Sequence, residues 1–263
     1  MGGRAGKLLA ALAAAVLAAG TTVTAGETVR IATDAPYAPM EYLNPDGTFT
    51  GFDIDLGNEL CKRAGFECTW QDQEWEGMFP GLLSRKYDAI MSSMTINERR
   101  RKQALFSDAY IVVPSAFFVA VDSPLTEISE DTLRDKRIGV QRGTVQDDYV
   151  SATYGKIARI VRYQTGGDVT VDMEVGRLDT AFFDQITGQS DLIEAHPGKY
   201  HQIGPDLVEP KEYFGEGFGI AFRKRDTALA EAFNRALAEV RADGTYARIY
   251  EQYFHKAPPE LAD

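Results

Sequence analysis

The sequence predicts an α/β fold with mainly parallel sheets, and three observations lead to it. Strand-like and helix-like segments alternate almost throughout the chain, as expected when helices connect parallel strands. About 238 residues follow the first 25, enough for one large core or two smaller ones. Two extended segments, residues 110–121 with Pro114 and the glycine-rich residues 214–219, interrupt the pattern. They either cross between two sheets and flex there or are ordinary strands with a proline and a bulge.

The first half of the chain carries three predicted strands joined by two predicted helices. Residues 28–33 alternate valine, isoleucine and threonine with other residues, which is typical of a strand. Residues 53–65 place apolar side chains near one helical face. The same criteria predict a helix at 77–85 and strands at 67–71 and 87–91.

The second half repeats this order and ends in two helices. We expect strands at 137–140, 157–163 and 180–183, and helices at 146–152 and 168–177. Apolar residues three and four apart over residues 229–240 predict an amphipathic helix that ends at Gly244, and residues 246–253 predict a final helix.

The first 25 residues have the layout of a secretory signal peptide. Arg4 and Lys7 precede an apolar run over residues 8–19, and small residues at 23–25 offer a cleavage point. This run is too short to span a bilayer, which takes about 20 residues. We therefore expect an exported protein that begins near Gly26, with a retained N-terminal anchor as the alternative.

Charge and cysteine content exclude some functions. Removing the leader takes the formal charge from −11 to −13, and a chain this acidic is a poor candidate for binding nucleic acid. Cys61 and Cys68 lie seven positions apart, so an oxidising compartment favours a disulfide between them. Two thiols and scattered histidines make an incomplete ligand set, which argues against a metal site.

Polar residues follow the predicted strands at their carboxyl ends, where open α/β sheets bind ligands. Asp34 and Tyr37 follow the first strand, and Ser92, Ser93 and Thr95 follow the third. Such a site would combine a carboxylate, an aromatic ring and several hydroxyl groups.

Two predicted helix starts add groups suited to an anion. Thr95 and Glu98 match a capping box, and an arginine just behind them, such as Arg100, can grip a carboxylate through two parallel hydrogen bonds. Thr144, Val145 and Gln146 open a similar helix whose amide groups we expect to be exposed. A solvated helix face is the alternative for the arginine, and an ordinary capped helix for the second start.

Asp184 closes the apolar strand at 180–183, where it either accepts hydrogen bonds from a ligand ammonium or caps the next helix. Catalytic motifs are weak. The chain has no nucleophile elbow, zinc-protease helix or phosphate loop. Its acids also form no distinctive acid–base pair.

Several ordered motifs resemble the periplasmic amino-acid-binding proteins, in particular the lysine/arginine/ornithine- and histidine-binding branch of bacterial ABC importers, solute-binding protein family 3. The resemblance covers the whole mature chain, including the cysteine pair. Its motifs are TDAPYAP (33–39), GFDIDL (51–56), DAIMSSMT (88–95), GRLD (176–179) and RADGTY (241–246).

The resemblance implies a two-lobed periplasmic-binding-protein fold of type II, with a ligand cleft between the lobes and two crossing hinge strands. Residues 26–112 and 217–263 would form lobe 1, and residues 115–214 lobe 2. The hinge would lie near residues 112–114 and 215–217.

The resemblance also implies a role for each site residue. Arg100 would grip an α-carboxylate with help from Thr95 and the segment Thr144, Val145 and Gln146. Asp184 would bind the α-ammonium together with Ser93 and Thr95. The side chain would lie between Tyr37 and Trp75, near Ser92, with its distal positive charge on Asp34. Two residues depart from the family pattern: Val145 replaces a frequent threonine, and Gln141 a frequent leucine.

These roles imply a monomeric periplasmic protein that captures free arginine, lysine, ornithine or histidine. It would deliver the ligand to an inner-membrane ABC permease, without a cofactor. An opine is a further ligand to consider. The alternatives are an enzyme of the same fold, such as a cyclohexadienyl-type dehydratase, and a ligand-binding sensor subunit.

Overall fold

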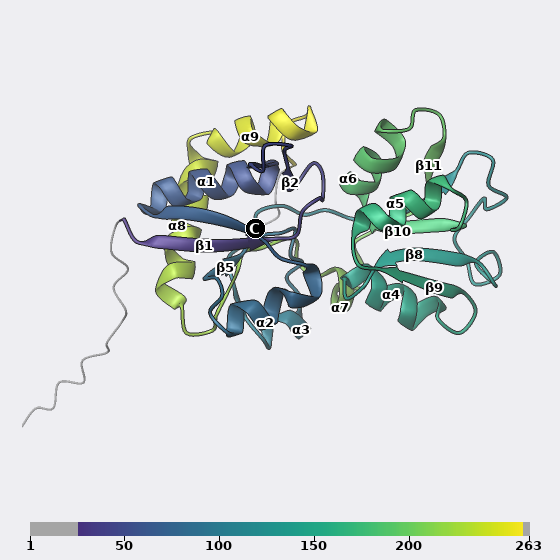
Figure 1. Ribbon diagram of the computed structural model, residues 1–263, viewed down its shortest axis with the longest axis horizontal. Coiled ribbons are helices and arrows are strands. Elements are labelled where there is room, and N and C mark those ends of the chain that lie inside the picture. The colour runs from purple at the N-terminus through teal and green to yellow at the C-terminus, as the bar shows by residue number, and fades with distance from the viewer. Residues whose placement is uncertain (1–25, 260–263) are drawn as a thin grey trace, which may run out of the picture.

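The computed structural model describes residues 26–259, so the predicted signal peptide lies outside the described residues. Two lobes lie side by side and are joined by thin connections near the middle (Figure 1). Each lobe contains one five-stranded sheet, with strand order β4-β1-β5-β12-β6 in the first and β11-β7-β10-β8-β9 in the second.

The first lobe contains the elements before the first connection and those after the second. Their bounds are β1 Thr28–Thr33, β2 Tyr42–Leu43, β3 Phe49–Thr50, α1 Phe52–Ala64, β4 Glu67–Asp72, the 3₁₀ helix Trp75–Gly77, α2 Met78–Leu83, β5 Ala89–Ile90, α3 Glu98–Arg101, β6 Leu105–Phe106, β12 Ala221–Phe222, α8 Thr227–Ala242 and α9 Thr245–Phe254.

The second lobe contains the elements between the two connections. Their bounds are β7 Ser115–Ala120, β8 Arg137–Gln141, α4 Val145–Tyr154, β9 Arg159–Tyr163, α5 Gly166–Glu174, β10 Thr180–Asp184, α6 Gln185–Gly188, the π-helix Gln189–Glu194, β11 Tyr200–Leu207 and α7 Lys211–Phe214.

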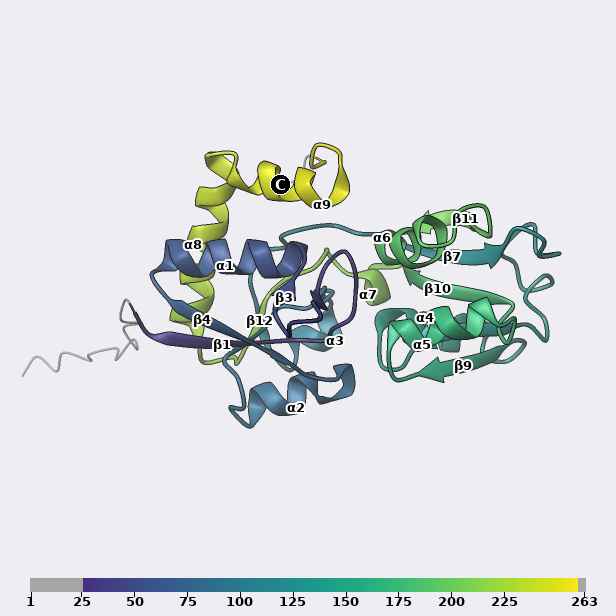
Figure 2. The same ribbon diagram turned by 45° about the horizontal axis from the view of Figure 1, so that its top comes forward.

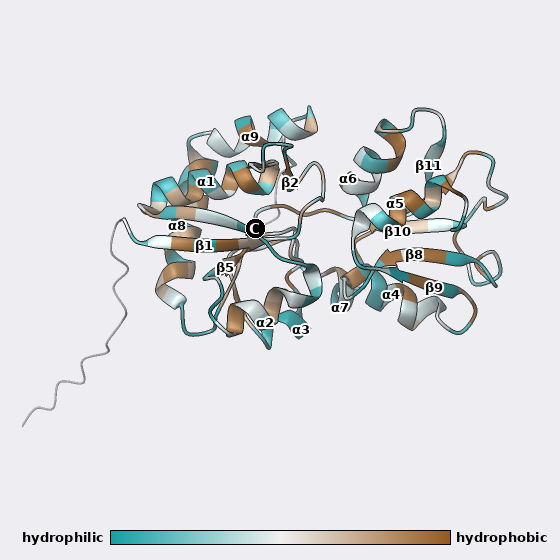
Figure 3. Ribbon diagram, in the orientation of Figure 1, coloured by the Kyte–Doolittle hydropathy of each residue, from teal (hydrophilic) through white to brown (hydrophobic). Residues whose placement is uncertain are grey.

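Helices cover both faces of each sheet. Alternate residues of a strand point to opposite faces, so each strand packs against helices on both sides. In β1, Val29 and Ile31 pack with α1, α8 and α9, whereas Ala32 packs with α2. Figure 2 shows α2 on the opposite side of this sheet from α1 and α9. In the second lobe, Phe117 packs on the α4 side and Phe118 on the α5 side. The hydrophobic strand segments in Figure 3 follow from this double cover.

The sheets are mixed, so the prediction of mainly parallel sheets is wrong in part. Strands β4, β1 and β5 are parallel, and so are β10, β8 and β9. Strands β7 and β12 run antiparallel to their neighbours. Each is the first strand after a connection between the lobes. A chain that enters a sheet from the other lobe arrives at the carboxyl ends of the parallel strands and therefore runs against them.

The second connection also differs from the prediction. Residues 214–219 were expected to be extended, but Phe214 ends α7 and Gly215 has a φ of 61°. A Cβ on Gly215 would lie 2.0 Å from the Ile96 carbonyl oxygen, so glycine is required by both conformation and space. Phe218 then forms isolated β-bridges with Thr95 and Ile111. The two connections are therefore hydrogen-bonded to each other.

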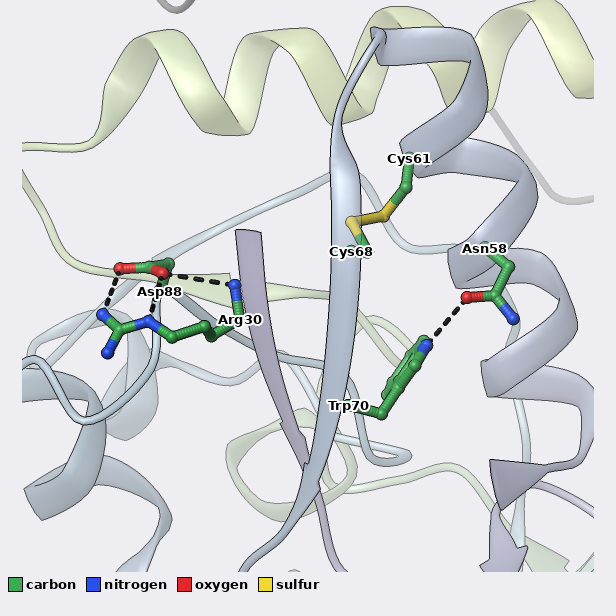
Figure 4. The surroundings of a disulfide bond; sticks show 6 residues. All are labelled: Arg30, Asn58, Cys61, Cys68, Trp70 and Asp88. Carbon is green, nitrogen blue, oxygen red and sulfur yellow. Dashed lines mark hydrogen bonds and ion pairs between the residues drawn. A yellow bond between two sulfur atoms is a disulfide. The ribbon is translucent and has the colours of Figure 1, made fainter. Parts of the chain in front are cut away.

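A disulfide joins Cys61 at the end of α1 to Cys68 in β4, as predicted (Figure 4). Because the bridge closes a short loop, the chain-entropy model gives it about 2.5 kcal/mol of stabilisation. We expect the Cys61→Ala, Cys68→Ala variant to lose about that much free energy of unfolding in a urea titration. Reduced wild-type protein is the matched comparison. An unfolding midpoint equal to that of the oxidised protein would contradict this prediction.

Candidate functional site

One cavity between the lobes collects every side chain predicted to contact a ligand. Its volume is about 340 Å³. Strands β1 and β5 of the first lobe, and β8 and β10 of the second, end at or near its wall, as expected for the carboxyl ends of parallel strands. The lining consists of Asp34, Tyr37, Glu41, Trp75, Ser92, Ser93, Thr95, Arg100, Gln141, Thr144, Val145, Gln146 and Asp184.

Arg100 brings a buried positive charge to this cavity. Arg100 is 3% exposed. Its guanidinium donates a hydrogen bond to the Thr95 carbonyl oxygen at 3.0 Å and lies 5.1 Å from the centre of the Trp75 ring. Burial, with the nearby charge of Arg99, lowers the pKa of Arg100 to about 10. The group is therefore still charged at neutral pH. Its other N–H groups have no hydrogen-bond partner within residues 26–259.

The predicted capping box at Thr95 and Glu98 is wrong. Helix α3 begins only at Glu98, so Thr95 lies two residues before the N-cap position, where it forms a β-bridge with Phe218. Asn97 caps α3 instead, accepting a hydrogen bond from the Arg100 N–H at 3.0 Å. Thr95 still contributes, because its carbonyl oxygen fixes the Arg100 side chain.

Asp184 places a carboxylate at the end of β10. It accepts hydrogen bonds from the Tyr37 hydroxyl and from Nε2 of Gln146, both at 2.7 Å. Burial raises its pKa to about 6. It occupies the N-cap position of α6 but makes no capping hydrogen bond there. The sequence left open whether Asp184 binds a ligand or caps the next helix. The structure directs its side chain to the cavity.

Asp34 supplies a second carboxylate, carried by the loop after β1. Its Oδ2 accepts a hydrogen bond from Nε2 of Gln141 at 2.7 Å, and its N–H donates to Oγ of Ser92 at 2.9 Å. Burial raises the pKa of Asp34 to about 7, and the charges of Asp72 and Glu74 act in the same direction. A cation beside Asp34 would favour the ionised form.

The start of α4 forms the opposite wall. Thr144 caps this helix by accepting from the Asp147 N–H at 3.2 Å, as predicted, and its hydroxyl donates to the Gln141 carbonyl oxygen at 2.8 Å. The expectation of exposed amide groups fails at Gly143, whose N–H donates to Asp147. Val145 adds an apolar, 3% exposed residue to this wall.

Besides the hydrogen bond from Asn97 Nδ2 to the Tyr213 carbonyl oxygen, five polar contacts among residues 26–259 connect the two lobes around the cavity. Three are hydrogen bonds: Tyr37 to Asp184 at 2.7 Å, Gln141 to Asp34 at 2.7 Å, and Trp75 Nε1 to the Gly143 carbonyl oxygen at 3.0 Å. Two are ion pairs: Arg99 with Asp148, and Arg142 with Glu76 at 3.6 Å. The lobes are therefore in contact across the cleft.

Glu41 is the cavity residue that the sequence analysis missed. It is 1% exposed and accepts hydrogen bonds from the hydroxyl groups of Ser92 at 2.7 Å and Ser93 at 3.4 Å. Burial, then the nearby carboxyl of Asp53, raises its pKa well above the usual range. The one feature of the sequence that could have indicated Glu41 is its position: it is an acid that directly follows Met40, within the loop that carries Asp34.

Asp53 holds the turn that displays the serines. Ser93 has a φ of 48°, a left-handed conformation that costs a serine some free energy. The Ser93 N–H donates to Oδ2 of Asp53 at 2.8 Å, and the Tyr110 hydroxyl donates to the same oxygen at 2.7 Å. This fully buried carboxylate thus compensates for the backbone strain at the site.

Most side-chain donors of the lining are already engaged. Both amide protons of Gln141 and of Gln146 have acceptors, and the Trp75, Tyr37 and Thr144 donors reach oxygens of the protein. Ser92 and Ser93 donate to Glu41. Among these side chains, Arg100 retains free N–H groups, whereas the carboxylates of Asp34 and Asp184 retain acceptor capacity.

Among residues 26–259, no group of three or more His, Cys, Asp or Glu side chains is placed to hold a metal ion. No helix in the same range is long and apolar enough to cross a membrane.

Residues 29–256 match the model of bacterial extracellular solute-binding proteins, family 3. The chain belongs to this family. Among family 3 relatives, the lysine/arginine/ornithine-binding periplasmic protein of Escherichia coli is 39% identical over 87% of this chain and 88% of its own length. The L-arginine-binding protein of Pseudomonas aeruginosa is 40% identical over 94% of this chain and 95% of its own length.

The fold agrees with solved structures of family 3 proteins. A Salmonella typhimurium periplasmic binding protein, described as having high arginine specificity, superposes with a TM-score of 0.79 at 29% identity. The match covers 87% of this chain and all of that one. These relatives are named as binding proteins, so the chain is a binding protein and not an enzyme.

Proposed function

We propose that this protein captures a basic amino acid in the periplasm by closure of its lobes and delivers it to an ABC permease. The observation that carries the proposal is the charge content of the cavity: one arginine and three acids, Asp34, Glu41 and Asp184. A basic amino acid has one negative and two positive groups, so it complements Arg100, Asp184 and Asp34 and leaves Glu41 neutral.

The binding mode follows from the free hydrogen-bonding groups. Arg100 offers parallel N–H groups to the α-carboxylate, a charge-assisted arrangement. Asp184 accepts from the α-ammonium, and Asp34 from the distal cation. A buried charge needs a partner, and each ligand charge then has one.

Two aromatic rings suit the aliphatic and cationic part of the ligand. Tyr37 and Trp75 both line the cavity. A cation near an aromatic face gains electrostatic stabilisation in addition to apolar contact. The relatives named above bind lysine, arginine or ornithine, and this supports the same ligand class here.

The remaining assignments rest on the family. The two connections act as the hinge, near residues 112–114 and 215–217, between lobe 1 (residues 26–112 and 217–263) and lobe 2 (residues 115–214). The ligand must bind the closed form better than the open one, because only differential affinity shifts such an equilibrium. The protein acts as a monomer in the periplasm, exported by its signal peptide.

A thermal-shift panel on refolded, ligand-free protein tests the ligand class. We expect arginine, lysine, ornithine or histidine to raise the melting temperature, because a ligand at 100 times its Kd adds about 2.7 kcal/mol of stability. Glutamine, glutamate and an opine serve as comparisons. Stabilisation by glutamate or glutamine alone would contradict the proposal, and stabilisation by the opine alone would replace the free amino acid as ligand.

A further inference from the structure

Glu41 controls the direction of two hydroxyl groups at the cavity wall. Oε1 of Glu41 accepts from Ser92 at 2.7 Å and Oε2 accepts from Ser93 at 3.4 Å. The Ser92 oxygen also accepts the N–H of Asp34 at 2.9 Å. Ser92 and Glu41 are each 1% exposed, so solvent does not compete for these bonds.

A serine hydroxyl has one proton and two lone pairs. Once Ser92 donates its proton to Glu41, it has no proton for a ligand. One lone pair accepts the Asp34 N–H, so the hydroxyl presents its other lone pair to the cavity. The neighbouring Asp34 carboxylate is also an acceptor, and both amide protons of Gln141 are engaged by Asp34 and the Gln164 carbonyl oxygen. This end of the cavity therefore presents side-chain acceptors without free donors.

The orientation of Ser92 holds for the Glu41 carboxylate and for the neutral acid whose proton is on Oε2. Burial and Asp53 raise the pKa of Glu41 well above the usual range. A neutral carboxyl group still has a carbonyl oxygen that accepts from Ser92. The carboxylate has two such oxygens; in the neutral acid, the bond from Ser92 to Oε1 is kept when the proton is on Oε2, the oxygen with the longer contact.

We propose that Glu41 is a specificity-determining positioning residue, which orients the Ser92 and Ser93 hydroxyl groups so that this end of the cavity accepts only hydrogen-bond donors. The inference rests on the proposed function, because it concerns the distal group of a basic ligand. A guanidinium or ammonium has donors alone and satisfies these acceptors. A urea or carboxamide group places its own oxygen against lone pairs and is rejected.

Arginine and citrulline are the probes, because they share a shape and differ in guanidinium against urea. We expect Glu41→Met, which removes the acceptor, to lower the ratio of citrulline Kd to arginine Kd roughly tenfold. The freed Ser92 proton then turns to citrulline or to Asp34, and either change lowers the ratio. Glu41→Gln retains an acceptor oxygen and keeps the ratio within about twofold of wild type.

Isothermal titration calorimetry gives both constants, and Ser92→Ala tests the route. In the Ser92→Ala background, Glu41→Met should change the logarithm of the citrulline-to-arginine Kd ratio by less than half of its change in wild type. Ser93, the remaining hydroxyl, forms the weaker bond to Glu41. An unchanged ratio in Glu41→Met overturns the inference. An equal loss in Glu41→Gln also overturns it, because charge rather than hydroxyl direction would then be responsible.

Two further results keep the test decisive. If Glu41→Met does not fold, Ser92→Ala alone must lower the ratio while Glu41→Gln preserves it, and any other pattern overturns the inference. Wild-type protein that binds none of arginine, lysine, ornithine and histidine would instead contradict the proposed function. The two failures are thus distinguishable.

Discussion

Replacing Arg100 by alanine is expected to remove measurable binding of a basic amino acid. Removing one partner of a buried charge pair costs about 2–5 kcal/mol, which is about 30-fold to several thousand-fold in Kd. Arg100 is the charged side-chain donor that the cavity keeps unpaired, so an α-carboxylate has no substitute for it. Calorimetry with arginine measures the change.

Arg101→Ala is the matched control for Arg100→Ala. Arg101 is in the same helix, but it is absent from the cavity lining and pairs with Glu216. Its substitution should leave Kd within about twofold, and both variants should retain the wild-type circular dichroism spectrum. Tight binding by Arg100→Ala would refute the assigned carboxylate site.

Asp34→Asn is expected to remove the preference for a cationic side chain. The substitution keeps the shape and the contact with Gln141 but removes the negative charge. Arginine should bind at least about 30-fold more weakly, corresponding to about 2 kcal/mol, because its guanidinium loses a buried partner. Citrulline, which lacks the charge, should be much less affected. Equal losses for both ligands would show that Asp34 does not select charge.

The pH dependence provides a second measurement on the Asp34→Asn variant. In the ligand-free protein the pKa of Asp34 is about 7, and a bound cation lowers it, so binding releases a proton. Affinity should therefore rise with pH up to about 7 and then level off. Asp184 and Asp53 are present in both proteins and contribute equally to their pH profiles. The contribution of Asp34 is therefore the difference between the wild-type and Asp34→Asn profiles. Identical profiles would contradict it.

The sequence predicts the regular elements well where periodicity is strong. The predicted strand at residues 28–33 matches β1 exactly, and the apolar stripe over residues 229–240 lies within α8. These patterns report burial on one face, which local sequence encodes. Strands β7 and β12 run antiparallel because of the connections between lobes, and local pattern carries no information on that direction.

The site was predictable to a different extent. Asp34, Ser92 and Asp184 follow strand ends, and their convergence is a rule of α/β topology. Glu41 reaches the cavity through hydrogen bonds to serines about 50 positions away in the chain, which no local pattern reveals. Thr95 is not the cap because α3 begins only at Glu98, with Asn97 at its N-cap position.

The contacts that connect the lobes also bear on the speed of ligand exchange. Arg100 and Asp184 are 3% and 6% exposed, so a molecule reaches them only after the Tyr37–Asp184 and Trp75–Gly143 bonds break. With the hinge closure proposed above, residence time is expected to be governed by the opening of the lobes as well as by contacts with the ligand. Ligands of different affinity would share similar association rates and differ mainly in how long they delay that opening.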